Sequence, residues 1–253
     1  MPEGDTIHRT ALVLDQALAG RSLVGIELPR LRFTPFAPGT LVEGVDAAGK
    51  HCLVRFDDGR TLRTHLGMTG SWHLYRRGER WKRSRAGMRA LVAVPDWDAV
   101  CFAAPTVELA VEPRIAHLGP DLCEPDSDVE EAVRRLAAVD GERAIGEVLL
   151  DQRVASGIGN IWKNEACFAC GIDPSSPLAL VGGDERRRLL VTASAFLRRS
   201  VAGDRPAPAV YGRAGQACRR CGSPLRWTRL GTPPRGTYWC AACQPNRTGT
   251  ASR

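Results

Sequence analysis

Hydrophobic residues at helical spacing open the chain and give way to strand-like patterning after about twenty residues. One face of the opening segment carries Ile7, Ala11, Leu14 and Leu18. This spacing predicts an amphipathic helix over residues 6–19, capped by Asp5 or Thr6 and stopped by Gly20. From residue 22 to 104, short apolar runs are separated by turn signals such as the Asp-Gly at 58–59. That pattern is typical of a β-sandwich.

The pattern returns to helical spacing after Pro120 and ends in a cysteine-rich segment. The predicted helices cover residues 128–138, 144–152, 158–170 and 184–201. A loop at 202–209, rich in Pro and Ala, precedes the cysteines. The predicted fold class is α+β multidomain, with a β-sandwich and its helix at 1–122, a helical domain at 123–205 and a zinc-binding hairpin with a tail at 206–253.

Nine cysteines are present, and four of them form two CxxC pairs separated by 18 residues. These four are Cys218, Cys221, Cys240 and Cys243. Each CxxC turn brings two sulfurs toward one ion, so the spacing predicts one structural Zn²⁺ in a four-thiolate site, with a redox pair as the alternative. The pair Cys167 and Cys170 lies in a helical pattern instead, which favours buried thiols.

The charge is basic and unevenly distributed. The net charge is +7, and only Lys50, Lys82 and Lys163 are lysines among 35 basic residues. Residues 205–253 carry nine Arg and no Asp or Glu, and residues 76–89 carry seven basic residues and one Glu. Such runs are often solvated faces, but an acid-free final fifth of a basic chain favours a polyanion partner.

Membrane and export signals are missing from the pattern. No apolar run approaches the roughly 20 residues that a membrane span requires. The first ten residues are acidic and polar, unlike a secretory signal. We therefore expect a soluble, cytoplasmic protein without a membrane partner.

The N-terminus has its own chemistry. Because Pro2 is small, removal of Met1 exposes a secondary amine whose pKa, like that of other α-amino groups, is near 8. Such an amine attacks an aldehyde-like sugar carbon and gives a cationic imine, which accepts electrons during elimination. Glu3 is adjacent and is a candidate proton donor or acceptor.

Five motifs in order resemble the Fpg/Nei family of bifunctional DNA glycosylases, which excise oxidised bases and nick the strand. The motifs are residues 2–6, 49–51, 64–72 and 157–166, and the cysteine hairpin with Arg235. The resemblance covers nearly the whole chain. It implies a β-sandwich that carries the reactive amine, a helix-two-turn-helix domain and a zinc hairpin.

The resemblance also implies roles for the catalytic set. Pro2 is expected to attack C1′ of the flipped nucleotide, displace the damaged base and form a Schiff base. Glu3 is expected to protonate the sugar ring oxygen. Lys50, at a hairpin tip, is expected to contact phosphates beside the lesion and take part in catalysis, whereas a lone hairpin would favour a solvated turn lysine. Arg235 is expected to hold flanking phosphates.

Four further residues are expected to bind DNA. Asn160 matches the asparagine of the helix-two-turn-helix element, with a helix N-cap as the alternative. Met68 matches the side chain that fills the gap after flipping, although its setting also suits a core residue. Glu165 matches a helix position that faces the cleft, with a surface or capping role as the alternative. Lys163 lies in the same helical motif.

Two absences indicate the branch of the family. Residues 102–109 do not contain the Asp-Pro-Arg-Arg-Phe-Gly pattern that places an Arg and a Phe on a second loop in the guanine-directed Fpg branch. Residues 202–217 are too few for the base-capping loop of that branch. Both favour the endonuclease VIII (Nei) branch and oxidised pyrimidines, although residues 65–70 read more like Fpg. The alternatives are an Fpg-like enzyme on 8-oxoguanine and formamidopyrimidine, and a non-catalytic zinc-hairpin DNA-binding protein.

The predicted function is therefore a base-excision-repair glycosylase with lyase activity by β,δ-elimination. Its expected partner is damaged DNA. No nucleotide cofactor is expected. We expect a monomer, because a groove that wraps DNA needs no partner subunit.

Overall fold

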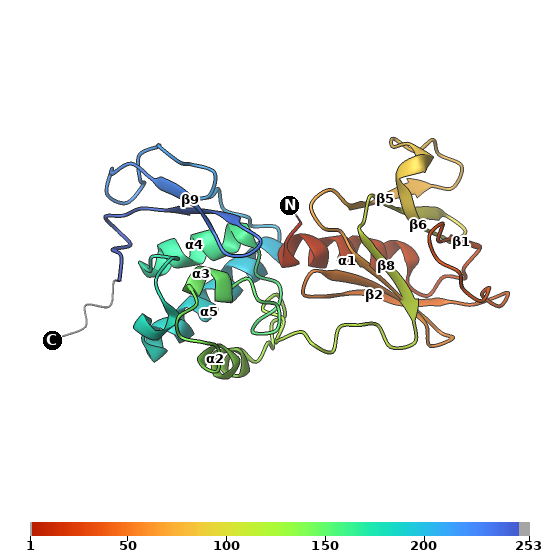
Figure 1. Ribbon diagram of the computed structural model, residues 1–253. Helices are drawn as coiled ribbons and strands as arrows, with labels where there is room; N and C mark the ends of the chain where they lie inside the picture. Colours follow the sequence, from red (N-terminus) through yellow and green to blue (C-terminus); the bar gives the residue numbers. More distant parts are fainter. Residues whose placement is uncertain (1, 248–253) are drawn as a thin grey trace. The chain divides into compact units, whose positions relative to one another are not determined.

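The computed structural model describes residues 2–247 (Figure 1). The chain divides into two compact units, Met1–Ala116 and His117–Arg253. The predicted domain boundaries after residues 122 and 205 stay predictions. Met1 and the predicted tail beyond residue 247 lie outside the described residues. No helix within residues 2–247 combines the length and the apolar character that crossing a membrane requires.

The first unit is the predicted β-sandwich with its N-terminal helix, α1 (Gly4–Leu18). One sheet has the strand order β1-β6-β7-β5 and the other β2-β3-β4-β8. The strands are β1 (Gly25–Glu27), β2 (Val42–Ala48), β3 (His51–Phe56), β4 (Thr61–His65), β5 (Ser71–Arg76), β6 (Met88–Ala93), β7 (Trp97–Phe102) and β8 (Thr106–Ala110). All pairings between neighbouring strands in both sheets are antiparallel.

Helix α1 forms where the apolar spacing predicts it and packs on the sandwich core. Its buried face contains the four predicted residues Ile7, Ala11, Leu14 and Leu18. The helix begins at Gly4, two residues before the predicted start, with Glu3 in the N-cap position. Its end is followed by Gly20, which takes a φ of +72° that a residue with a Cβ rarely adopts. Burial of this face therefore fixes the first residues of the chain against the sheets.

The connection between β5 and β6, residues 77–87, crosses the outer face of the first sheet. Strands β5 and β6 both pair with β7, so the chain must pass over β7 to reach the start of β6 (Figure 1). A short 3-10 helix, η1 (Arg85–Gly87), ends the crossing. Trp81 packs against a second apolar cluster on this face that includes Tyr75 and Phe102. We call residues 77–87 the basic crossover.

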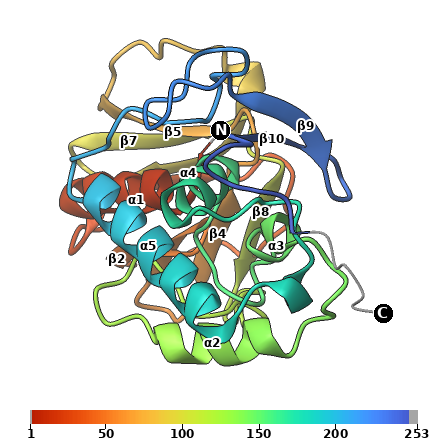
Figure 2. The same ribbon diagram turned by 90° about the vertical axis from the view of Figure 1, so that its left-hand side faces the viewer.

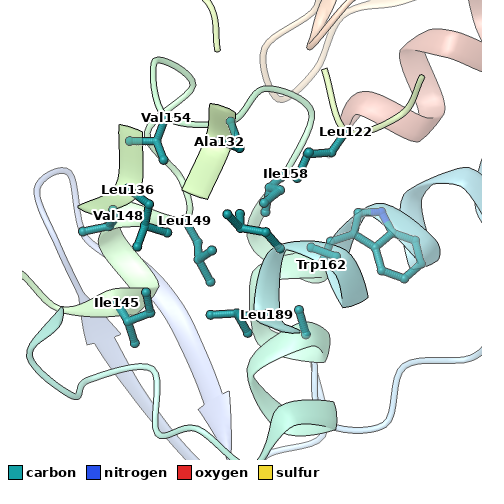
Figure 3. Close-up of a cluster of buried hydrophobic side chains, with 14 of the residues drawn as sticks. Leu122, Ala132, Leu136, Ile145, Val148, Leu149, Val154, Ile158, Trp162 and Leu189 are labelled. Atoms are coloured by element: carbon teal, nitrogen blue, oxygen red, sulfur yellow. The ribbon is translucent and has the colours of Figure 1, made fainter. Parts of the chain in front are cut away.

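The second unit is helical and carries the cysteine hairpin. Its elements are α2 (Val129–Ala137), α3 (Ile145–Val148), α4 (Asn160–Cys170), η2 (Leu178–Leu180), α5 (Gly183–Val201), β9 (Arg226–Leu230) and β10 (Arg235–Trp239). Residues from all of the α-helices surround one core, in which Trp162 is among the largest fully buried side chains (Figure 3). The predicted fold class, with its sandwich, helical region and hairpin, is confirmed.

One predicted helix is much shorter than expected. The pattern predicts residues 144–152, whereas α3 ends at Val148. The side chain of Gln152 explains the difference, because its Nε2 donates to the carbonyl oxygens of Leu150 and Ile158 while its Oε1 accepts the Gly157 N–H. These bonds fold residues 150–158 into consecutive turns that lead into α4.

Candidate active site and metal centre

The first unit brings several sequence-predicted segments to one end of the sandwich. Asp15 Oδ1 accepts the Val45 N–H at 2.8 Å, and the Gly20 N–H donates to the Val42 carbonyl at 2.8 Å, so α1 and β2 run antiparallel. A helix covers about 16 Å from Asp15 back to Gly4, and a strand covers about 16 Å from Val45 to Lys50. The start of α1 and the β2–β3 turn therefore lie at the same end.

Two more loops reach this end. His65, the last residue of β4, pairs with His51 beside Lys50, so residues 66–70 leave the sheet here. The same His65 pairs with Thr106, so the short β7–β8 connection at 103–105 lies here as well. Four segments thus converge: the N-terminus with Pro2, the Lys50 turn, the Met68 loop and residues 103–105.

Pro2 and Glu3 occupy different environments within this end. Pro2 is half-buried, whereas Glu3 is completely buried at the N-terminus of α1. The Glu3 carbonyl accepts the backbone N–H groups of Thr6 and Ile7, which starts the helix. The amine and the carboxylate are therefore held by the first turn of one helix.

Lys50 is presented by a two-residue hairpin turn. Ala48 pairs with His51, which leaves Gly49 and Lys50 as the turn. Gly49 has a φ of +57°, and a glycine with positive φ in the first turn position is the type II′ pattern that fits the twist of paired strands. Gly49 is therefore what lets the strands place Lys50 at the tip.

A pair of histidines beside Lys50 was not among the predicted site residues. The rings of His51 and His65 lie 5.0 Å apart. Arg63 Nη1 lies 3.2 Å from His51 Nδ1, so it donates and His51 carries its proton on Nε2. Burial, and then the charges of Lys50 and Arg63, lower the pKa of His65, so this ring is neutral at pH 7. The signal for His65 was its place at the start of the Met68 motif.

Met68 is one of the most exposed apolar side chains of the described residues, with 68% of its surface accessible. The core position that was the alternative for Met68 is thereby wrong. Gly67 has a φ of +58°, and a Cβ there would lie 2.8 Å from Pro105 of the neighbouring loop. The loop is therefore compact, and it projects a flexible apolar side chain into solvent.

In the second unit, α4 lies beside β10 (Figure 2). Polar side chains of α4 bond to this strand. Asn160 Nδ2 donates to the Gly236 carbonyl at 2.9 Å, and Lys163 Nζ donates to Thr237 Oγ1 at 2.8 Å. Asn164, which the sequence did not single out, accepts the Tyr238 N–H at 2.7 Å. These bonds fix the strand that begins with Arg235.

Two of these side chains differ from the roles considered for them. Gly159, not Asn160, holds the N-cap position of α4, so the N-cap alternative for Asn160 is wrong. Lys163 is almost completely buried, with 1% of its surface accessible. Its bond to Thr237 ties α4 to the hairpin, and the assignment of Lys163 to DNA binding stays a prediction.

Glu165 binds the chain segment that precedes the hairpin. Its two carboxylate oxygens accept the backbone N–H groups of Ala209, Val210 and Tyr211 at 2.7 to 3.1 Å. The side chain is buried, so the three donors replace the water that an exposed carboxylate would bind. Glu165 therefore fixes the end of the short loop between α5 and the hairpin.

Arg235 lines a cavity of about 310 Å³ beside the hairpin tip. Arg143, Arg153 and Asp151 line the same cavity. Hydrogen bonds from Arg153 hold the pKa of Asp151 at about 2, so this carboxylate is ionised near neutral pH. The cavity holds three arginines against two carboxylates, the second being Glu147, and this balance favours an anionic ligand.

The four predicted cysteines form one cluster. Their sulfur atoms all lie within 4.8 Å of one another, with Cys221 and Cys240 at 3.5 Å and Cys218 and Cys243 at 4.0 Å. A tetrahedral ion with bonds of about 2.3 Å holds its sulfurs about 3.8 Å apart. The cluster is consistent with one four-thiolate metal site.

Of the other cysteine pair, Cys167 is buried as predicted, whereas Cys170 is only partly buried. Burial raises the pKa of Cys167 to about 12, and the Cys170 thiol lies 3.5 Å from Thr192 Oγ1. A neutral, buried thiol is a poor nucleophile and a poor ligand.

The contacts of Lys163 allow a test of whether this residue stabilises the second unit or contacts DNA directly. Lys163→Met removes the bond to Thr237, and we expect a loss of about 1–3 kcal/mol in the free energy of unfolding of the second unit. Thermal denaturation of the full chain measures it, with Lys82→Met, an exposed lysine, as the control that leaves stability unchanged. Unchanged stability with weakened DNA binding would contradict the scaffold role.

Each of the two units matches a known protein-family domain. Residues 1–105 match the formamidopyrimidine-DNA glycosylase N-terminal domain, and residues 118–207 match the formamidopyrimidine-DNA glycosylase H2TH domain. A solved structure of Lactococcus lactis formamidopyrimidine-DNA glycosylase, bound non-covalently to DNA with an AP site, superposes with a TM-score of 0.83 over 97% of this chain and all of that one. The two are 20% identical in sequence, so this likeness concerns the fold.

Curated relatives are closer in sequence. Probable endonuclease 8 2 of Streptomyces coelicolor is 40% identical over 96% of this chain and 94% of its own length. The DNA-(apurinic or apyrimidinic site) lyase Nei2 of Mycolicibacterium smegmatis is 34% identical over 96% of this chain and 99% of its own length. With both domain models matched in order and full-length relatives at this identity, the chain belongs to the Fpg/Nei family of DNA glycosylases and apurinic/apyrimidinic-site lyases.

Proposed function

We propose that this chain excises oxidised bases, mainly oxidised pyrimidines, from DNA and then cleaves the strand through a Schiff base to Pro2. The observation that carries the proposal is the convergence of the Pro2 amine, Glu3, Lys50 and the Met68 loop at one end of the first unit. The relatives named endonuclease 8 support the same chemistry.

The reaction begins on a nucleotide rotated out of the duplex, because a stacked base is out of reach. The lone pair of the Pro2 nitrogen attacks C1′, the C1′–N bond to the base breaks, and the base leaves with the proton that the Pro2 nitrogen gives up. Glu3 protonates the ring oxygen, which opens the sugar and leaves an iminium ion. The Glu3 carboxylate then takes a proton from C2′, the C–H electrons move toward the iminium ion, and the 3′ phosphate leaves. Loss of a proton from C4′ expels the 5′ phosphate in the same way.

The remaining residues bind and orient the strand. Lys50 supplies a compact charge at a hairpin tip, which suits a phosphate beside the reacting sugar. Met68 fills the space that the flipped nucleotide leaves, and its exposure is what this role requires. In the second unit, Asn160 and Arg235 contact the DNA backbone from adjoining elements. The buried Lys163 and Glu165 support this surface by fixing β10 and residues 209–211.

The four-cysteine cluster would hold one Zn²⁺ ion. The all-sulfur donor set and its spacing suit zinc in a closed structural site, which has no open position for chemistry. Bound there, the ion supplies folding energy to a hairpin with few apolar residues. Its contribution to the reaction is therefore the placement of β10 and Arg235.

Two features support oxidised pyrimidines over 8-oxoguanine. The β7–β8 connection has only three residues, 103–105, which leaves no room for the additional Arg and Phe of the guanine-directed branch. Only residues 202–208 lie between the end of α5 and the segment 209–211 that Glu165 binds. Both loops are therefore shorter than the loops with which the guanine-directed branch contacts the damaged base.

Side-by-side cleavage of three oligonucleotides tests the proposal. In single-turnover assays we expect excision of thymine glycol to exceed that of 8-oxoguanine opposite cytosine by at least about tenfold. Abasic-site DNA should be cleaved and, with borohydride, trapped on the protein. The opposite order of rates would support the Fpg-like alternative. Salt-sensitive binding without cleavage of abasic DNA would indicate the non-catalytic alternative.

A further inference from the structure

The basic crossover is not used by the reaction above, yet its residues occupy a defined surface. It lies on the outer face of the sheet that contains β5, β6 and β7, away from the sandwich core (Figure 1). Lys50 belongs to the turn of the other sheet. The charges that act on His65 are those of Lys50 and Arg63, whereas those that act on His73 are Arg83 and Lys82. The end of the crossover adjoins the 103–105 loop, because the Gly87 carbonyl accepts the Ala103 N–H at 2.9 Å, whereas its middle lies over the outer face of the sheet.

The crossover is anchored by an aromatic side chain. Trp81 is half-buried, with its ring stacked 6.3 Å from Tyr75 and edge-on at 6.0 Å to Phe102. The backbone N–H of Lys82 donates to the Tyr75 hydroxyl at 3.2 Å. Because Trp81 packs inward, its neighbours along the chain point toward solvent. The charged side chains thus extend from a backbone that is already ordered, which reduces the entropy lost on binding.

The arginines at the two ends of the crossover are neutralised within the protein. Arg77 forms an ion pair with Asp98 at 3.1 Å, and Arg85 forms one with Glu27 at 2.6 Å. The only acidic residue inside the crossover, Glu79, accepts the backbone N–H of Arg76. These contacts hold both ends of the crossover in place. The net positive charge therefore lies in its middle.

Three cations in the middle have no carboxylate partner. Arg80, Lys82 and Arg83 are exposed, and no carboxylate of residues 2–247 lies within 4.0 Å of their side-chain nitrogens. Lys82 is also one of only three lysines in the chain. Uncompensated cations in a cluster create a positive surface potential, so a polyanion that covers them would be bound favourably.

We propose that Arg80, Lys82 and Arg83 form a second binding site for the phosphate backbone of duplex DNA, outside the lesion site. The proposal rests on the proposed function, because an enzyme that acts on DNA meets this polyanion at every encounter. The site has no acceptor groups to read bases, so it binds without regard to sequence. It adds affinity for undamaged DNA during the search for lesions.

The salt dependence of binding to lesion-free DNA tests the site. The triple variant R80Q/K82Q/R83Q of the full chain is titrated with a lesion-free duplex of about 40 base pairs over a range of salt concentrations. Each lost phosphate contact reduces the slope of log K against log salt by about 0.9, so we expect a decrease of about 2 to 3. At about 0.1 M salt, affinity for this duplex should fall at least about tenfold.

The charge-preserving variant R80K/K82R/R83K is the matched control and should keep the wild-type slope. Single-turnover excision of thymine glycol at saturating enzyme should be unchanged in both variants, because the contact is the same in ground and transition states. An unchanged slope in the Gln variant overturns the site. That result is expected if the three cations bind an acidic protein instead of DNA. A slower excision step in that variant also overturns it, since the residues would then belong to the lesion site.

Failure of the proposed function gives a different result. If wild-type protein excises no base and traps no abasic DNA, the proposed reaction fails. The slope on lesion-free DNA still reports on the crossover in that case. Melting temperatures of both variants equal to wild type show that any loss of binding comes from the changed charges.

Discussion

Acylating the Pro2 nitrogen is expected to abolish the covalent adduct between this protein and abasic DNA. In a variant that retains an N-terminal extension, this nitrogen is part of a peptide bond and its lone pair is delocalised into the carbonyl. It then cannot attack C1′ or form an iminium ion. We expect borohydride trapping and base excision to fall at least about a thousandfold, since covalent catalysis is lost altogether. Gel electrophoresis of the trapped adduct measures the loss.

Glu3→Gln is the matched control for this result, because it keeps the amine. Trapping on abasic DNA should persist in that variant, while excision of an oxidised base falls by about 10²–10⁴, the range expected for a lost general acid. Peptide mapping of the wild-type adduct should locate the sugar on the peptide that begins with Pro2. An extended variant that traps abasic DNA as well as wild type would rule out Pro2 as the nucleophile.

Removing one thiolate from the four-cysteine cluster is expected to have the second largest effect. Cys240 is completely buried, and Cys240→Ser should weaken metal binding by about a hundredfold, if four thiolates share about 12 kcal/mol of binding energy. Loss of the ion should unfold the hairpin and detach β10, which begins with Arg235, from α4. Elemental analysis should find one zinc per wild-type chain and much less in the variant, with DNA binding lost in parallel.

Cys170→Ser provides the control within the same chain. Cys170 also belongs to a CxxC pair, but it lies on α4 near Thr192 and not in the cluster. We expect its zinc content and DNA binding to equal those of wild type. Zinc content that stays at one in Cys240→Ser, or that falls equally in both variants, would contradict the assignment of the metal site.

Local patterns predicted the elements of the fold well. The apolar spacing of α1 and the turn at residues 58–59 depend on neighbours in sequence, and the structure confirms both. The early end of α3 could not be predicted, because it depends on Gln152 bonding to Ile158 after the chain has turned back. Helix propensity in that stretch is overruled by a side chain that satisfies the backbone in another way.

In the candidate site, too, features that depend on neighbours in sequence were predictable, whereas features that depend on distant residues were not. The four cysteines were predictable because their spacing alone brings pairs of sulfurs together. The Asn164 bond to Tyr238 joins residues 74 positions apart, and the contact between the tilted rings of His51 and His65 depends on strand register. Neither leaves a local signal. Glu165 was recognisable as a motif residue, but its three backbone donors come from a loop without any pattern of its own.

The hydrogen bonds between Glu165 and residues 209–211 affect how such enzymes can change substrate over evolution. The loop that precedes these residues has two fixed ends. One is the end of α5, and the other is the segment bound by Glu165. Lengthening a loop with fixed ends costs only about 0.6 kcal/mol for each doubling. Residues 202–208 are therefore a point where insertions can accumulate without disturbing the hairpin. A lineage can extend its base contacts there while Arg235 and the metal site stay in place.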